Sequence, residues 1–264
     1  MVLSNSPEIF NPITSEAFLF ELKNLGIKKG MPLLVISSKN FSKQIIGGSH
    51  AVVETLLNSV GTEGTLIMEA FNILNSEPSF WKRPVIPQHF LKSMREFMPV
   101  SNVYYDDVAS EIVDNFRKRP KVVYSFHPRF SYLAIGKLAK AITAGRELNY
   151  AFGQTSLLQR LYELNGHVLF LGKKVNQSTA LYLAQYHSGK FPKILQGAKV
   201  SLGIENKWQK YLELRHHHRY DEKLVTELID YKLLKVSELN QQTIALANMR
   251  SFSDYARDYY LRNI

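Results

Sequence analysis

The feature that most constrains the fold of this chain is a set of three short, largely apolar runs. They cover residues 32–36, 65–68 and 167–171, and each has a glycine or serine at one or both ends. A short apolar run between turn signals is typical of a strand that is buried on both faces. Such strands need helices above and below them, so we expect an α/β fold with a central sheet flanked by helices.

Helical patterns alternate with these runs along the chain. The first pattern places Phe18, Leu22 and Leu25 on one face, and Thr14 or Ser15 supplies a capping hydroxyl. Further helices are predicted over residues 50–60, 109–117, 136–144, 156–164, 179–186, 221–231 and 243–250, extended segments over 121–124 and 210–214, and a tyrosine-rich tail at the end.

The 264 residues show no linker-like change of composition, so we expect a single domain over residues 1–264. One stretch interrupts the regular pattern. Residues 72–107 contain four prolines and no clear apolar period. We expect an irregular excursion here, and long loops in compact domains are often functional lids or binding loops.

Composition excludes several classes of site. The chain has no cysteine, which rules out disulfides, cysteine-ligated metals and a cysteine nucleophile. No apolar run reaches the roughly 18–20 residues of a membrane span, and the first residues lack a signal-peptide pattern. We therefore expect a cytoplasmic protein with no membrane partner.

The charge balance favours anionic partners. Lys and Arg number 33 against 23 Asp and Glu, which gives a formal net charge of +10. A general bias toward lysine is the alternative explanation. No helix-turn-helix, zinc-finger or aromatic RNA-binding pattern is present, so nucleic acid is not expected as a partner.

Two glycine-containing segments could bind an anion. Gly47-Gly48-Ser49 precedes a predicted helix, whose free amide groups favour phosphate, although an ordinary serine-capped turn is the alternative. Gly172-Lys173-Lys174 follows a buried strand, where ligands of α/β folds bind, although an exposed basic loop is the alternative. Ser37 and Ser38 end another buried strand and could position a ligand carbonyl or amide.

Histidines are the candidate general bases. His127 lies in a loop before a proline, and a run of three histidines, residues 216–218, follows Glu213. Side chains alternate in an extended segment, so the three cannot bind one metal ion together, and we predict no metal site. An exposed cationic strand end is the alternative for this run.

Four stretches resemble, in the same order, the aminoglycoside 3-N-acetyltransferase family. They are residues 25–38 followed by 47–68, then 110–136, 149–172 and 179–186. The resemblance implies that family's α/β fold, acetyl-CoA as co-substrate, an amine of an aminoglycoside-like sugar as acceptor, and no metal. It also implies a histidine that removes the amine proton, because an ammonium ion cannot attack a thioester.

The resemblance assigns candidate roles to particular residues. The catalytic candidates are Tyr182, Glu213, His127 and His216. The candidates for binding CoA are Ser37, Ser38, Gly47, Gly48, Ser49, His127, Ser131, Phe152 and Lys173.

The sequence departs from the family pattern at the positions to which the resemblance assigns the catalytic chemistry. Tyr182 stands where the resemblance places the catalytic histidine, and Gln185, Asn176 and Arg215 stand where it places acids. A tyrosine has an ordinary pKa of about 10, so Tyr182 cannot simply replace a histidine. The lost acids and the added cations also disfavour a polycationic acceptor.

These departures leave several hypotheses open. The leading one is a divergent CoA-dependent N-acyltransferase whose acceptor is a neutral or anionic amino sugar, with His127 or His216 as base. The others are an inactive family member that binds CoA or a protein partner, and an anion-binding protein that depends on its charge. The chain could act alone or as a homodimer. Tyr182 is predicted to face the cleft within reach of Glu213, the alternative being that it packs into the core.

Overall fold

The computed structural model describes residues 11–103, 106, 110–216 and 222–264. Within them the strands are β1 (Pro32–Ser37), β2 (Thr65–Phe71), β3 (Val123–Tyr124), β4 (Phe130–Gly136), β5 (His167–Leu171), β6 (Lys193–Leu202), β7 (Glu205–Leu214), β8 (Leu234–Leu239) and β9 (Gln242–Asn248). The α-helices are α1 (Ser15–Leu25), α2 (Gly48–Val60), α3 (Leu91–Phe97), α4 (Glu111–Arg117), α5 (Ala139–Ile142), α6 (Leu157–Glu163), α7 (Tyr182–Ser188), α8 (Glu222–Asp230) and α9 (Met249–Asn263). Short 3-10 turns are η1 (Phe41–Gln44), η2 (Pro78–Phe80), η3 (Gln88–Phe90), η4 (Val175–Gln177) and η5 (Thr179–Leu181).

Seven of these strands form one mixed sheet in the order β3-β4-β2-β1-β5-β9-β8. The three apolar runs of the sequence are β2, β1 and β5, which lie side by side and parallel at the centre. The antiparallel strands β4 and β9 flank them. Because the central strands are parallel, their carboxyl ends meet at one edge of the sheet.

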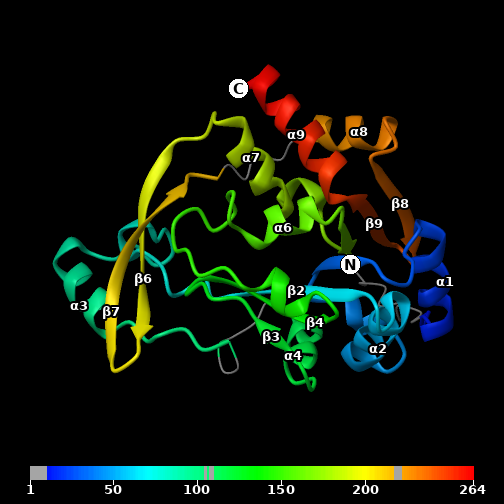
Figure 1. Cartoon of the computed structure of the whole chain (residues 1–264), viewed down its shortest axis with the longest axis horizontal. Coiled ribbons are helices and arrows are strands. Elements are labelled where there is room, and N and C mark those ends of the chain that lie inside the picture. Colours follow the sequence, from blue (N-terminus) through cyan, green and yellow to red (C-terminus); the bar gives the residue numbers. More distant parts are fainter. Residues whose placement is uncertain (1–10, 104–105, 107–109, 217–221) are drawn as a thin grey trace, which may run out of the picture.

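Helices cover both faces of this sheet, which confirms the predicted architecture (Figure 1). Alternate residues of β1 point to opposite sides: Leu33 and Val35 enter one apolar cluster, and Leu34 and Ile36 enter the other. The first cluster is completed by α1, α2 and α4, and the second by α6, α7 and α9.

The end of the chain differs from the prediction. Residues 243–250 were predicted to be helical, but they lie almost entirely in β9, and the tyrosine-rich tail is α9. Strand β9 is buried between β5 and β8, so its residues are apolar on both faces and show no two-residue alternation. The structure also adds β4 and β8, which the prediction missed, and shortens the helix predicted over 136–144 to α5.

The excursion over residues 72–107 is irregular as predicted, apart from α3 and short 3-10 turns. It packs against the β6–β7 hairpin, and together they form an arm beside the sheet (Figure 1). Buried Asn75 makes the connection: its Nδ2 donates to Lys199 O at 2.9 Å, and its Oδ1 accepts from Lys199 N at 2.7 Å. The excursion therefore helps to fix the hairpin whose second strand carries Glu213.

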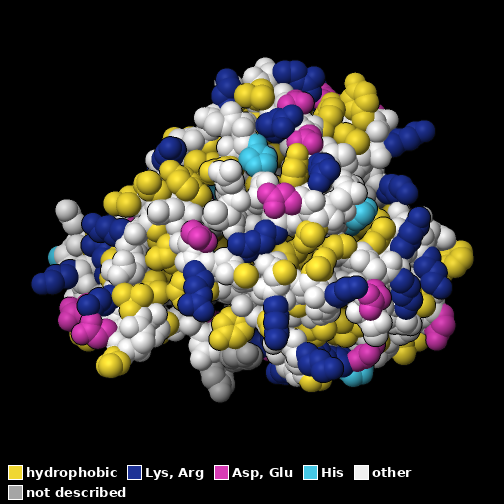
Figure 2. Space-filling model, in the orientation of Figure 1, with side chains coloured by type: hydrophobic (Ala, Val, Ile, Leu, Met, Phe, Trp, Pro, Cys, Tyr) yellow, Lys and Arg dark blue, Asp and Glu magenta, His cyan; other side chains and the backbone are white. Residues whose placement is uncertain are grey.

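Lys and Arg side chains are scattered over the face shown in Figure 2 rather than gathered into one patch. Among the described residues, no helix combines the length and the apolar character that crossing a membrane requires.

Candidate functional site

Two rings from distant parts of the sequence meet near the carboxyl edge of the sheet. Tyr182 begins α7, and His216 follows the end of β7. The rings stack with centroids 3.8 Å apart and planes inclined by 8°. The fold therefore places a histidine directly against the position where the family resemblance expects one.

His216 contacts a buried carboxylate. Its Nε2 lies 3.4 Å from Glu213 Oε1, and the side chains are only 8% and 4% exposed. On the other side of the ring, Nδ1 lies 3.0 Å from Gln185 Oε1. Nδ1 can donate its proton to this amide oxygen, while Nε2, which is buried, faces the Glu213 carboxylate.

Backbone amides fix the orientation of Glu213. Its Oε2 accepts a hydrogen bond from Ala151 N, and its Oε1 accepts one from Leu214 N, both at 2.9 Å. A carboxylate fixed in this way stabilises an imidazolium ion that forms beside it. Glu213 and His216 thus form a buried imidazole–carboxylate pair.

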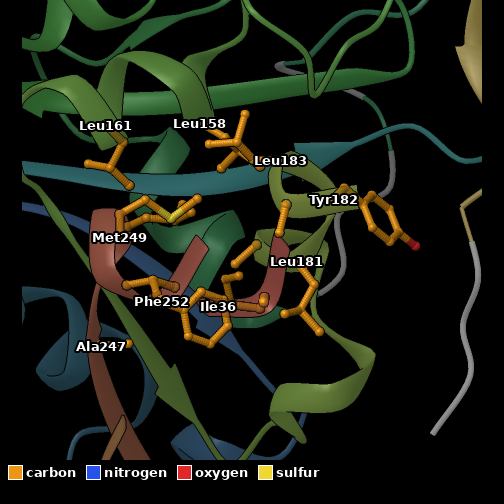
Figure 3. Close-up of a cluster of buried hydrophobic side chains, with 14 of the residues drawn as sticks. Ile36, Leu158, Leu161, Leu181, Tyr182, Leu183, Ala247, Met249 and Phe252 are labelled. Atoms are coloured by element: carbon orange, nitrogen blue, oxygen red, sulfur yellow. The ribbon is translucent and has the colours of Figure 1, made fainter. Parts of the chain in front are cut away.

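Tyr182 lies at the rim of the apolar cluster. In Figure 3 its ring points away from Leu158, Leu183 and the other aliphatic side chains, although it is largely buried. Burial, followed by the nearby charge of Glu69, raises its pKa well above the ordinary value. The phenol therefore stays protonated near neutral pH and can donate a hydrogen bond, but it cannot act as the base.

Glu69 is a site residue that the sequence analysis did not single out. It belongs to β2, and burial raises the pKa of its carboxyl to about 7, although the Thr179 hydroxyl donates a hydrogen bond to it and Lys173 lies nearby. The available signal was that Glu69 is the one acid in an otherwise apolar strand. Its proximity to Tyr182 comes only from the tertiary fold.

His127 does not have the geometry of a base. Its Nδ1 accepts hydrogen bonds from Arg129 N and Phe130 N at 3.2 and 3.0 Å, and its Nε2 donates to Leu148 O at 3.2 Å. Burial, the largest cause, lowers its pKa to about 4. Both ring nitrogens are thus engaged, and the ring fixes the loop that precedes β4.

Two residues predicted to bind the cofactor make contacts within the protein instead. Ser131 Oγ is 2.7 Å from His127 O and 3.1 Å from Ser125 O, so its hydroxyl is used within the loop. Phe152 is 0% exposed and packs edge-on against Tyr182 and His216, at 5.0 and 5.3 Å between centroids. It supports the stacked pair and has no free surface for a cofactor.

The glycine cradle, defined here as residues 47–49 and the start of α2, is open. Gly47 caps α2 with φ +86°, and no side chain caps this helix end, so the predicted alternative of a serine cap is wrong. Gly48 has φ +60°, and a Cβ added there would meet nothing within 4 Å. Amide groups at such an uncapped helix start can accept an anion.

Ser37 and Ser38 lie at the carboxyl end of β1 and are half-buried. Ser37 Oγ is 3.2 Å from Ser110 Oγ. Lys173 borders a hollow of about 620 Å³ between the end of β5, α8 and β9, which Lys174 and Asn176 also line. The structure thus gathers Tyr182, Glu213 and His216, whereas His217 and His218 lie outside the described residues.

Comparison with known proteins gives one consistent family. The sequence model described as aminoglycoside 3-N-acetyltransferase matches residues 34–260. The SPbeta prophage-derived aminoglycoside N(3')-acetyltransferase-like protein YokD of Bacillus subtilis (strain 168) is 30% identical over 255 residues, which cover 96% of this chain and 94% of YokD. Aminoglycoside N(3)-acetyltransferase III of Pseudomonas aeruginosa is 29% identical over 182 residues, which cover 66% of this chain and 64% of that enzyme.

Solved structures agree in fold. The crystal structure of YokD superposes with a TM-score of 0.87 at 30% identity, over 96% of this chain and all of YokD. The structure of AAC-IIIb in a binary complex with CoASH gives a TM-score of 0.82 at 19% identity, over 96% of this chain and 98% of that one.

Proposed function

Because the chain belongs to the aminoglycoside 3-N-acetyltransferase family, we propose that it transfers an acetyl group from acetyl-CoA to the amine of a small acceptor. The observation that carries the proposal is the buried pair of His216 and Glu213 against Tyr182. This pair supplies a proton acceptor at the point where the family histidine is missing.

The proposed chemistry is a direct transfer. Acetyl-CoA supplies an activated thioester. The His216 imidazole removes a proton from the acceptor ammonium or from the attacking amine, and Glu213, 3.4 Å from Nε2, stabilises the resulting imidazolium. The neutral Tyr182 hydroxyl can donate a hydrogen bond to oxygen on the acceptor or on the acetyl carbonyl. The new amide C–N bond replaces the C–S bond, and the thiolate takes up a proton.

The proposed cofactor site is the glycine cradle with Ser37 and Ser38. Its support is the uncapped start of α2 and the open space above Gly48. Phosphate groups would bind the amides there, and the two serines would line the path toward the thioester. Lys173 would add positive charge from the neighbouring strand end.

The proposed acceptor is a neutral or anionic amino sugar rather than a polycationic antibiotic. The support is the exposed Arg215 beside His216, together with Gln185 in contact with the base. A polycation needs acidic side chains at these positions. The arginine repels it by like charge, and the amide supplies no negative charge to attract it.

A second candidate function is binding of CoA, or of a protein partner, without turnover. It is favoured by Tyr182, whose pKa is raised and which cannot accept the proton itself. In that case the His216–Glu213 pair would be a structural remnant.

The two candidates separate in one set of measurements. Calorimetry with CoA should show binding under either candidate. Release of free thiol from acetyl-CoA in the presence of glucosamine, glucosamine 6-phosphate and muramic acid, with mass spectrometry of the products, should show acetylated amine only under the first. CoA binding with no acetylated product from any amine would favour the second candidate.

A further inference from the structure

Arg129 brings a positive charge close to the cluster of Tyr182, Glu213 and His216. It directly precedes β4, and its backbone N–H is fixed by His127 Nδ1. The guanidinium lies over the ring of Phe130, with Cζ 4.7 Å from the centroid. An aromatic face holds a guanidinium in place and leaves its N–H edge available to a ligand.

Two tyrosines locate this guanidinium within the site. Its charge opposes the rise in pKa that burial causes at Tyr211 and at Tyr182. Tyr211 in turn packs edge-on against His127, with 5.3 Å between ring centroids. The ring of Phe130, over which the guanidinium lies, packs against Phe152 with 4.7 Å between centroids, and Phe152 packs against Tyr182 and His216 at 5.0 and 5.3 Å. Two ring contacts therefore connect the Arg129 side to the base.

Two buried polar atoms around this point, Arg129 Nε and the Tyr132 hydroxyl, lack a hydrogen-bond partner in the part of the chain that the structure describes. The guanidinium also hydrogen-bonds the Tyr211 side chain. Among the described residues, Arg129 makes no ion pair within 4 Å. Buried polar groups are normally paired, so this set indicates a missing ligand with acceptor oxygens.

We propose that Arg129 determines acceptor specificity by binding a carboxylate or phosphate group on the same molecule whose amine reacts at His216. Tyr211 adds a hydroxyl donor to the same oxyanion. This inference rests on the proposed function, and it narrows the acceptor to small amines that also carry an anionic group. A planar guanidinium binds such oxyanions with two parallel hydrogen bonds.

The test compares acceptors that differ in the anionic group. Glucosamine, glucosamine 6-phosphate and muramic acid offer the same amine with no anion, a phosphate and a carboxylate. The wild-type protein should show the highest kcat/KM for one of the two anionic amines. Arg129→Gln should lower that kcat/KM by about 10- to 100-fold, mainly through KM, because a charge-assisted hydrogen bond is lost. Its kcat/KM for glucosamine should change less than about threefold.

Two further variants serve as controls. Arg129→Lys keeps the charge without the planar fork and should restore part of the preference. Arg83→Gln removes an exposed arginine from the excursion and should leave all three values unchanged. An equal loss for all three acceptors in Arg129→Gln, or a wild-type preference for glucosamine, would overturn the inference.

Binding measurements keep the inference separate from the proposed activity. Calorimetry of glucosamine 6-phosphate and muramic acid with the CoA-bound protein needs no turnover. Arg129-dependent binding without acetylation would support the inference and contradict the proposed function. Acetylation of glucosamine, with no effect of the Arg129 variants on any acceptor, would support the proposed function and contradict the inference. Absence of both binding and acetylation would overturn both.

Discussion

His216 enters the site from the end of β7, whereas Tyr182 stands on the first turn of α7. The stacked contact lets the tyrosine orient the imidazole without competing for protons, since the pKa of Tyr182 is raised. The sequence predicts that Tyr182 and Glu213 lie near one another. His216 contacts both, so the three side chains form one buried cluster.

His127 predicts a pH dependence of stability. Its pKa is about 4 in the folded protein, against 6.5 as the ordinary value. Between these values the unfolded chain binds a proton that the folded protein does not, so the free energy of unfolding falls as the pH falls from 6.5 to 4. His127→Asn keeps an acceptor for the loop amides but does not titrate. We expect its loss of stability from pH 7 to pH 5 to be smaller by about 2 kcal/mol than that of the wild type.

Urea titrations at the two pH values measure this difference. Glu69 acts in the opposite direction, because its raised pKa of about 7 makes the folded protein take up a proton first on acidification. Both proteins contain Glu69, so the comparison between them removes its contribution. Identical pH dependence in the variant and the wild type would show that His127 is not held in its neutral form.

At the scale of the elements, the start of α2 is the proposed binding element for CoA. Gly48→Leu would place a side chain in the open space above the first-turn amides, and we expect the affinity for CoA to fall about tenfold or more. Gly30→Leu is a matched control. Gly30 also has a positive φ and open space around its Cβ, but it lies before β1, at the opposite end from the cradle. Equal affinities of the two variants in calorimetry would place CoA elsewhere.

The β6–β7 hairpin is the element that delivers Glu213 and His216. Asn75→Ala removes both hydrogen bonds to Lys199 and leaves a backbone N–H without its partner, which should cost about 1–3 kcal/mol of stability. Because the hairpin carries the proposed base, kcat should fall while the Kd of CoA stays unchanged. Asn206→Ala, at an exposed asparagine of the same hairpin, should change neither value. A loss of CoA affinity that matches the loss of kcat would argue against separate elements for the base and for CoA.

The elements show what could be predicted from the sequence and what could not. Strands β1, β2 and β5 have clear boundaries because glycine and serine interrupt their apolar runs. Strand β9 was mistaken for a helix, since burial on both faces removes its alternation and Ala, Leu and Asn do not favour strands. Helix α9 was missed although Met249, Phe252, Ala256 and Tyr260 recur at helical spacing.

In the candidate site, too, some residues could be predicted from the sequence and others could not. Tyr182, Glu213 and His216 could be selected because family resemblance and local sequence pointed to them. Arg129 and Glu69 could not, because neither carries a local signal that predicts its neighbours. Their positions depend on β4 pairing with β2 and on the arm bringing β7 back to the sheet.

At the scale of the whole molecule, charge predicts the phenotype. The formal net charge is +10, and the acceptor side that we propose carries Arg129 and the exposed Arg215. A polycationic antibiotic would be repelled from such a site. Expression in a sensitive bacterium should therefore give little or no protection against gentamicin-like or kanamycin-like antibiotics, as measured by inhibitory concentrations. A large rise in those concentrations would show that the protein does accept polycationic antibiotics as acceptors.

The most direct test of the central claim is acetyl transfer by His216→Phe. Phenylalanine keeps a ring against Tyr182 but removes the proton acceptor, so kcat should fall by about 10²–10⁴-fold. The Kd of CoA should stay within a factor of about two, because the cradle lies on another element. Tyr182→Phe, which keeps the stack and loses only a hydroxyl, should cost much less. An unchanged kcat in His216→Phe would contradict the account, because the proton would then be removed without this histidine.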